Sequence, residues 1–164
     1  MRRLDRDCSA DDSVIEKCIQ DSQVLRICMN TDGLPYIVPL CFGYEKVDGR
    51  RVFYFHKNRR GFLYELIEKD PRCSFELEGE HSLFMDEVKG TCNMDYASII
   101  GDGTISLVEG DEERKRTIDL LMDHYGRGDF GYDERLMSAI LVFRLEVDSL
   151  TCKATRGWKE KMGC

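Results

Sequence analysis

The sequence predicts a mainly β fold, a largely antiparallel barrel of about six strands with flanking helices. Apolar and polar residues alternate along several short segments, which is the period of a half-buried strand. Turn sequences such as Asn30-Thr31-Asp32-Gly33 and Asp48-Gly49 join neighbouring segments of this kind and are typical of hairpins. Helical patterns occur singly between strands, which favours antiparallel pairing over a regular parallel sheet.

The N-terminal half is expected to hold one helix and then extended segments. These elements are predicted over residues 12–20, 24–29, 34–44 and 52–55. Asp11 and Asp12 precede the helical pattern and can cap its first turn. The run 34–44 contains Pro35 and Pro39, which lack amide donors. This strand is therefore expected to have a locally unpaired or bulged side.

The C-terminal half alternates between helical and extended patterns. A helix is predicted over 58–69, strands over 73–78, 96–108 and 141–147, a second helix over 111–125, and a loop or irregular hairpin over 79–95. Asp70-Pro71 ends the first helix, because proline disfavours helix in the preceding residue. Gly101 and Gly103 indicate a bulge or a close backbone approach, and Asp111 is expected to cap the second helix.

Composition is that of an ordinary globular chain. The 164 residues are 42% hydrophobic and 34% charged, which predicts one domain over 1–164 with tails at 1–10 and 154–164. No apolar run is long enough to span a bilayer, and the basic start has no apolar core after it, so a cytoplasmic location is expected. The net charge of −7 disfavours nucleic-acid binding. The eight cysteines include no Cys-x-x-Cys pair, so they are expected to be reduced, without a metal site.

One segment contrasts with the acidic chain. Between Arg50 and Arg60 there are five basic residues and no acidic one, and Lys57, Arg59 and Arg60 stand where the helix is expected to begin. Cations are unfavourable at a helix N-terminus, but a bound anion reverses the sign. Gly61 leaves the backbone open to close approach. Two interpretations stay open: a phosphate site, or a solvated basic turn paired with surface carboxylates.

Three further motifs resemble one known family. They are the run Gly33-Leu34-Pro35-Tyr36-Ile37-Val38-Pro39-Leu40, the run Tyr96-Ala97-Ser98-Ile99-Ile100-Gly101-Asp102-Gly103, and the closing Thr151-Cys152-Lys153. Together with Tyr54-Phe55-His56 and the helix that ends before Pro71, they resemble the pyridoxamine 5′-phosphate oxidase-like split barrels. Within these, the chain looks like the nitroimidazole-resistance (Nim) branch. The resemblance implies a six-stranded antiparallel split β-barrel of the FMN-binding type.

The resemblance also implies a ligand and its contacts. FMN would lie at a homodimer interface, with its ring against Val38, Pro39, Leu40, Cys41 and Phe42. The phosphate would lie at the turn formed by His56, Lys57, Asn58, Arg59, Arg60 and Gly61, and Ser98 and Ile99 would line the pocket from the partner subunit. Where the family usually has Gly-Arg-Lys, this chain has Gly61-Phe62-Leu63, so the upstream cations are expected to replace the missing pair.

The function implied is that of an FMN-dependent oxidoreductase reducing a small nitroaromatic or quinone-like compound. His56 is the candidate catalytic residue, as a proton donor or substrate contact, since an imidazole can act as acid or base near neutral pH. The alternatives for His56 are phosphate binding and helix capping. The alternative for the whole protein is a non-catalytic split barrel that holds flavin or haem.

Overall fold

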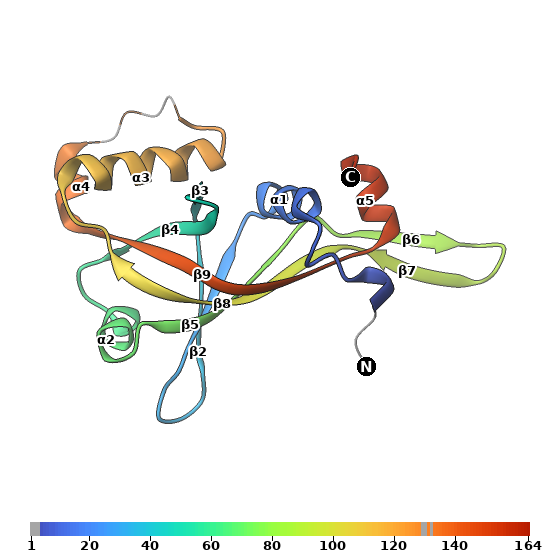
Figure 1. The fold of residues 1–164 in the computed structure, drawn as a ribbon, viewed down its shortest axis with the longest axis horizontal. Helices are drawn as coiled ribbons and strands as arrows, with labels where there is room; N and C mark the ends of the chain where they lie inside the picture. The colour runs from blue at the N-terminus through green and yellow to red at the C-terminus, as the bar shows by residue number, and fades with distance from the viewer. Residues whose placement is uncertain (1–3, 129–130, 132) are drawn as a thin grey trace. The chain divides into compact units, whose positions relative to one another are not determined.

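The computed structural model describes residues 4–128, 131 and 133–164 (Figure 1). The strands are β1 (Leu25–Met29), β2 (Tyr36–Leu40), β3 (Gly43–Val47), β4 (Arg50–Asn58), β5 (Arg72–Glu78), β6 (Ser82–Asp86), β7 (Thr91–Asp95), β8 (Ala97–Leu107) and β9 (Ile140–Ala154). The helices are η1 (Leu4–Arg6, a 3-10 turn), α1 (Asp12–Asp21), α2 (Phe62–Lys69), α3 (Asp111–His124), α4 (Glu134–Ala139) and α5 (Arg156–Met162). None of these helices combines the length and apolarity needed to cross a bilayer.

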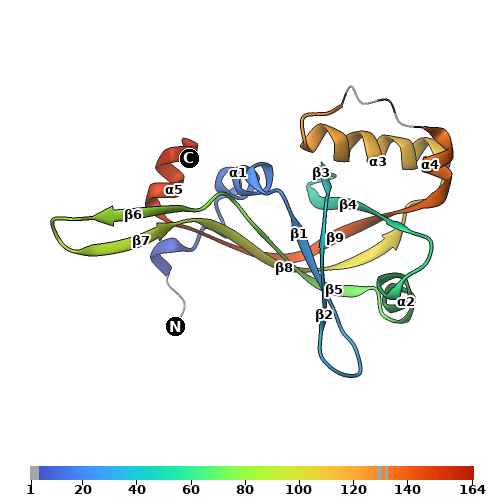
Figure 2. The same ribbon diagram turned by 180° about the vertical axis from the view of Figure 1, so that it is seen from behind.

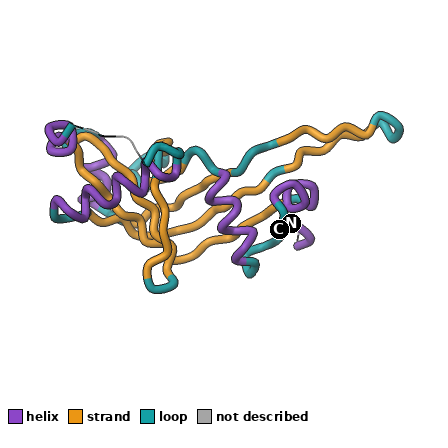
Figure 3. The backbone as a smooth tube through the Cα atoms, turned by 90° about the horizontal axis from the view of Figure 1, so that it is seen from above, coloured by secondary structure: helices purple, strands orange, loops and turns teal. Residues whose placement is uncertain are grey.

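The mainly β prediction is confirmed. Within the described residues, seven strands form one sheet in the order β2-β1-β5-β8-β9-β4-β3. β6 and β7 form a separate two-stranded hairpin, which is the long pair of strands ending in a loop in Figure 3. The pairs β1–β2, β3–β4, β4–β9 and β6–β7 are antiparallel. The strand number exceeds six because the run predicted over 34–44 is divided into two strands, and because the polar stretch 79–95 forms a regular hairpin.

The chain divides into two compact units, which are described separately. One unit comprises 24–75 and 101–149, and the other is made of 1–23, 76–100 and 150–164. Each unit combines segments that are far apart in the sequence. The single domain over 1–164 stays a prediction.

The core of the 24–75 and 101–149 unit is aromatic. Phe53 on β4 is fully buried, and its ring lies 5.6 Å from Phe42, 5.2 Å from Tyr44 and 5.4 Å from Phe75. Helix α3 packs on β3 at Gly43, where an added Cβ would lie 2.7 Å from the backbone nitrogen of Leu121. Glycine is required at this contact because a larger residue would push the helix away from the strand.

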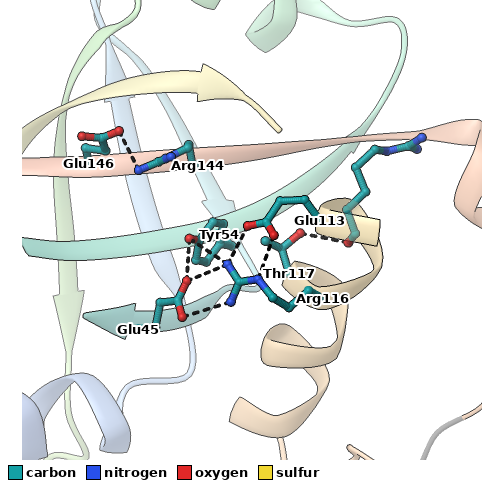
Figure 4. A network of polar contacts seen from close by, with 8 residues as sticks. Glu45, Tyr54, Glu113, Arg116, Thr117, Arg144 and Glu146 are labelled. Carbon is teal, nitrogen blue, oxygen red and sulfur yellow. Dashed lines mark hydrogen bonds and ion pairs between the residues drawn. The ribbon is translucent and has the colours of Figure 1, made fainter. Parts of the chain in front are cut away.

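A polar network also joins α3 to β3 and β4 (Figure 4). The Arg116 guanidinium donates to both carboxylate oxygens of Glu45, at 3.0 and 2.8 Å, and to both of Glu113, at 2.9 and 2.6 Å. The hydroxyl of the buried Tyr54 donates to Glu45 at 2.7 Å. Burial, with the neighbouring Glu45 carboxylate second, raises the pKa of Tyr54 to about 12. The hydrogen bond from Arg116, acting first, lowers the pKa of Glu45.

This network predicts a pH dependence of stability. Because the pKa of Glu45 in the folded state lies below the ordinary glutamate value of about 4.3, its contribution to stability is present above that pH and is lost as the pH falls through the folded pKa. We expect Glu45→Gln to lower the free energy of unfolding at pH 7 by about 1–2 kcal/mol and to flatten its decline between about pH 5 and 3. Urea unfolding at several pH values measures both effects. Glu112→Gln, on the exposed side of the same helix, is the control, and matching profiles for the two variants would contradict the expectation.

The other unit contains the two chain ends and the β6–β7 hairpin (Figure 2). The segment 154–164, expected as a tail, instead forms α5, whose Thr155 side chain accepts a hydrogen bond from the Trp158 amide at 3.3 Å. Trp158 is 1% exposed and anchors this segment. Sequence patterns missed the helix because its seven residues carry one buried side chain and therefore have no apolar stripe.

Candidate functional site

The first part of the candidate site is strand β2, which lies at the end of the sheet order. Pro39 falls inside this strand opposite Arg26 of β1, whereas Pro35 precedes it. An edge strand tolerates proline because one side of its backbone has no strand to pair with. The unpaired side expected from the sequence is thus confirmed in the described sheet. That edge leaves main-chain groups open to a ligand.

Side chains in this region alternate between core and surface. Val38 and Leu40 are buried, while Pro39 and Cys41 are exposed. Phe42 is fully buried, and its amide donates to the Tyr125 hydroxyl at 3.2 Å. A ligand contact from Phe42 would therefore have to come from its carbonyl group.

Two residues at the C-terminal end of α3, His124 and Tyr125, contact Phe42, and the sequence did not predict this. The ring of His124 lies 4.2 Å from that of Phe42, and the Tyr125 hydroxyl accepts the Phe42 amide. Burial raises the pKa of Tyr125 to about 12, so the hydroxyl stays protonated. The sequence held one signal for the position of Tyr125. Its spacing from Ile118 and Leu121 places its ring on the apolar face of the helix predicted over 111–125. The contact of His124 with Phe42 depends on the tertiary packing of α3 on β3, so no local sequence pattern indicates it.

The second part of the site is the turn from β4 to α2. His56, Lys57 and Asn58 end β4, opposite Val142, Leu141 and Ile140 of β9. Arg59, Arg60 and Gly61 follow as an exposed turn. The helix predicted from Asn58 begins only at Phe62, so the cations precede the helix and do not occupy its first turn.

Gly61 explains this correction. Its backbone has φ 142° and ψ 158°, a conformation that residues with a side chain rarely adopt and that cannot continue a helix. Gly61 is the N-cap, and no side chain caps the first turn of α2. The first-turn amides therefore have no side-chain acceptor at the cap, and no atom lies within 4 Å of the position of a Gly61 Cβ.

Charge is unevenly distributed around α2. At its C-terminal end, Lys69 contacts Asp32 at 2.9 Å and Arg72 contacts Asp70 at 2.8 Å. At its N-terminal end, no carboxylate of the described residues forms an ion pair with Lys57 or Arg60, whereas Arg59 has an interaction within the chain. The charges of Lys57 and Arg60 therefore have no ion-pair partner near the end of α2 where the helix dipole is also positive.

His56 lies beside this charge. Its side chain is exposed, yet the surrounding protein disfavours the charged imidazole, and the Lys57 ammonium adds repulsion. Both effects lower the pKa of His56, with desolvation the larger. The imidazole is therefore neutral at pH 7 and can accept a proton or a hydrogen bond.

The structure shows the surroundings of Phe62 and Leu63, which stand where the family usually has arginine and lysine. Leu63 is 1% exposed and belongs to the core, so a lysine there would have to bury its charge. Phe62 is exposed and contacts Tyr36 edge-on at 5.1 Å. Neither residue can supply a cation, which leaves Lys57, Arg59 and Arg60 as the basic residues of this turn.

The remaining predicted residues lie in the other unit. Ser98 and Ile99 are on β8, where Ser98 is half-buried and Ile99 is fully buried. In the same unit, His81 contacts Glu78 at 3.5 Å. Among the described residues, no group of three or more metal-ligating side chains is placed to hold an ion.

Comparisons with known proteins define the class of this fold as the pyridoxamine 5′-phosphate oxidase-like split β-barrels. The family model described as pyridoxamine 5′-phosphate oxidase matches residues 11–154, and the chain belongs to this family. No curated protein matched the sequence.

Several solved structures are similar. A candidate 5-nitroimidazole antibiotic resistance protein from Bacteroides thetaiotaomicron VPI-5482 is 25% identical, with a TM-score of 0.76 over 87% of this chain and 83% of that one. It supports the resemblance to the nitroimidazole-resistance branch. An FAD- and haem-binding protein from Mycobacterium smegmatis (17%, TM-score 0.72, 92% and 74% covered) and an FAD-binding protein from Mesorhizobium loti (18%, TM-score 0.62, 88% and 95% covered) share the fold.

Proposed function

We propose that the protein is an FMN-binding flavoprotein that reduces a small nitroaromatic or quinone-like compound at a homodimer interface. The observation that carries the proposal is the run of positive charge in front of α2, where Lys57 and Arg60 form no ion pair with a carboxylate of the described residues, beside first-turn amides that no side chain caps. A phosphate dianion would bring the guanidinium donors, the ammonium group and the helix dipole into favourable contact together. Family membership and the flavin named for similar folds support flavin as the group attached to that phosphate.

The residues present fit this ligand. Arg59, Arg60 and Lys57 would hold the phosphate, and the open position at Gly61 would let the backbone approach it. Main-chain groups on the free edge of β2, around Pro39 and in Cys41, would receive the ring. Ser98 and Ile99 of the second subunit would complete the pocket. The flavin, when bound, supplies electron and hydride transfer.

His56 is the candidate for proton handling. Because its imidazole is neutral at pH 7, it adds little charge to a phosphate site. It is better suited to accept a hydrogen bond from a substrate and to exchange a proton with it. We therefore favour substrate contact over phosphate binding for this residue.

A visible absorption spectrum of freshly purified protein tests the cofactor. We expect flavin bands, release of FMN on denaturation, and an assembly mass twice the 19.0 kDa of the chain by light scattering. Bleaching by NADH or NADPH followed by reoxidation with a nitro compound is expected for an oxidoreductase. FMN without turnover would identify a non-catalytic flavin protein, a Soret band would identify haem, and a colourless monomer that does not take up added FMN would refute the proposal.

A further inference from the structure

Three buried cysteines meet in the unit that contains the chain ends. Asp7 and Lys153 form an isolated antiparallel bridge, so Cys8 and Cys152 face each other in the next register position. The Cys8 amide donates to the Cys152 carbonyl at 3.0 Å, and the two sulfur atoms lie 2.6 Å apart. Cys18, from α1, makes a thiol hydrogen bond to Cys152. The exposed fractions of Cys8, Cys18 and Cys152 are 3%, 0% and 0%.

The backbone arrangement suits a covalent bond. Directly opposed residues of an antiparallel pair have Cα atoms about 4.5–5.5 Å apart, within the range of about 4.4–6.8 Å found in disulfides. The bond would join η1 and the start of α1 to the end of β9, two segments that are 144 residues apart in the chain.

The two thiols differ in acidity. The hydrogen bond with Cys152 is the main cause that lowers the pKa of Cys8; burial opposes this shift, and the positive charge of Lys159 adds to it. Hydrogen bonds with Cys18 and then with Cys8, together with burial, raise the pKa of Cys152. These directions, together with the nearby Lys159 ammonium, favour Cys8 over Cys152 as the nucleophile.

We propose that Cys8 and Cys152 are a modification site at which a peroxide introduces a reversible intramolecular disulfide. The Cys8 thiolate attacks one oxygen of hydrogen peroxide, breaks the O–O bond and becomes a sulfenic acid as hydroxide leaves. The Cys152 sulfur then attacks the Cys8 sulfur, forms the S–S bond and releases water. In total, two thiols lose two protons and two electrons, and one peroxide becomes two waters.

Access to the site is provided by the N-terminal segment. The 3-10 turn η1 contains no buried residue, and just after it the Asp7–Lys153 bridge and the hydrogen bond from the Cys8 amide to the Cys152 carbonyl join this segment to β9. Local opening of this terminal segment, short of global unfolding, would expose Cys8 to a small oxidant. In a reducing compartment the thiols are restored after the oxidant is removed.

Peptide mapping of the full-length protein tests the site. Protein treated with a few equivalents of hydrogen peroxide is denatured, alkylated and digested with trypsin without reductant. Cleavage after Arg6, Lys17, Arg26, Arg144 and Lys153 places Cys8 in peptide 7–17, Cys18 in 18–26 and Cys152 in 145–153. We expect peptide 7–17 to be linked to 145–153, and dithiothreitol to separate them.

Thermal unfolding provides a second readout. Closing so long a loop is expected to raise the midpoint of oxidised wild-type protein by roughly 5–15 °C, reversibly. Cys8→Ala should abolish this shift, whereas Cys92→Ala, at an exposed cysteine of the same unit, should retain it. A link between Cys18 and Cys152 in the wild type would overturn the proposal. The proposal would also be refuted if peroxide modified the exposed Cys41, Cys92 and Cys164 while Cys8 and Cys152 were still recovered as free, alkylated thiols.

Discussion

Replacing Arg59 and Arg60 together by alanine is expected to weaken FMN binding at least about 100-fold and to leave riboflavin binding nearly unchanged. Each guanidinium would donate charge-assisted hydrogen bonds to the phosphate, and one such bond contributes about 1.5–3 kcal/mol. A loss of 1.4 kcal/mol corresponds to a tenfold change in the dissociation constant. Riboflavin has no phosphate, so its affinity depends on the ring contacts at β2. Flavin fluorescence titration measures both affinities.

The matched control removes two arginine charges from the start of β4, the strand that precedes the basic turn. Arg50 is exposed and contacts Glu146 at 3.9 Å, and Arg51 is half-buried, while both lie at the start of β4. We expect Arg50→Ala/Arg51→Ala to change FMN affinity less than threefold, because long-range charge effects are largely screened beyond about 10 Å at 0.1 M salt. Equal losses of FMN and riboflavin affinity in Arg59→Ala/Arg60→Ala would show that the phosphate is held elsewhere.

Local sequence patterns predicted much of the fold because several elements carry their own signals. Helix α1 has an Asp11 cap, whose carboxylate accepts from the Val14 amide at 3.4 Å, and an apolar stripe. The two glycines of β8 also behave as expected. A Cβ at Gly101 would lie 2.5 Å from the Phe75 ring and from the Ser149 carbonyl, and at Gly103 it would lie 2.3 Å from the Glu146 carbonyl. These distances confirm a close backbone approach at both positions.

Element boundaries were predicted less well where a backbone conformation decides them. The helical pattern continued back to Asn58, but the extended geometry of Gly61 sets the start of α2. Helix α3 likewise begins after Gly110, so Asp111 is its first residue and is not the side-chain cap that the sequence suggested. In both cases the helix starts after a glycine, which permits several backbone conformations, and packing selects one of them.

The candidate site shows the same division between local and long-range information. The basic turn could be found from charge alone, because its residues are consecutive in the sequence. The neighbours of Phe42 could not, because His124 and Tyr125 are more than 80 residues away and reach it through the packing of α3 on β3. Ser98 and Ile99 were assigned by family resemblance, and their part in a pocket stays a prediction.

The aromatic core around Phe53, on the strand that precedes the basic turn, allows a prediction about stability. Phe53 precedes His56 by three residues on β4, is fully buried, and contacts the rings of Phe42, Tyr44 and Phe75. We expect Phe53→Ala to lower the free energy of unfolding by about 3–5 kcal/mol, because it removes a large apolar side chain and leaves a cavity among rigid rings. For a chain of this size the thermal midpoint should fall by roughly 10 °C. Urea and thermal unfolding of the ligand-free protein measure the loss.

Phe62→Ala makes the same chemical change outside the core and serves as the control. Phe62 is 51% exposed and has one edge-on contact, with Tyr36, so we expect a loss of about 1 kcal/mol or less. Because Phe62 also adjoins the basic turn, the pair separates core packing from proximity to the candidate site. Losses of similar size in the two variants would mean that burial of Phe53 among the aromatic rings does not stabilise β4 more than the exposed contact of Phe62 stabilises α2, and would contradict the expectation.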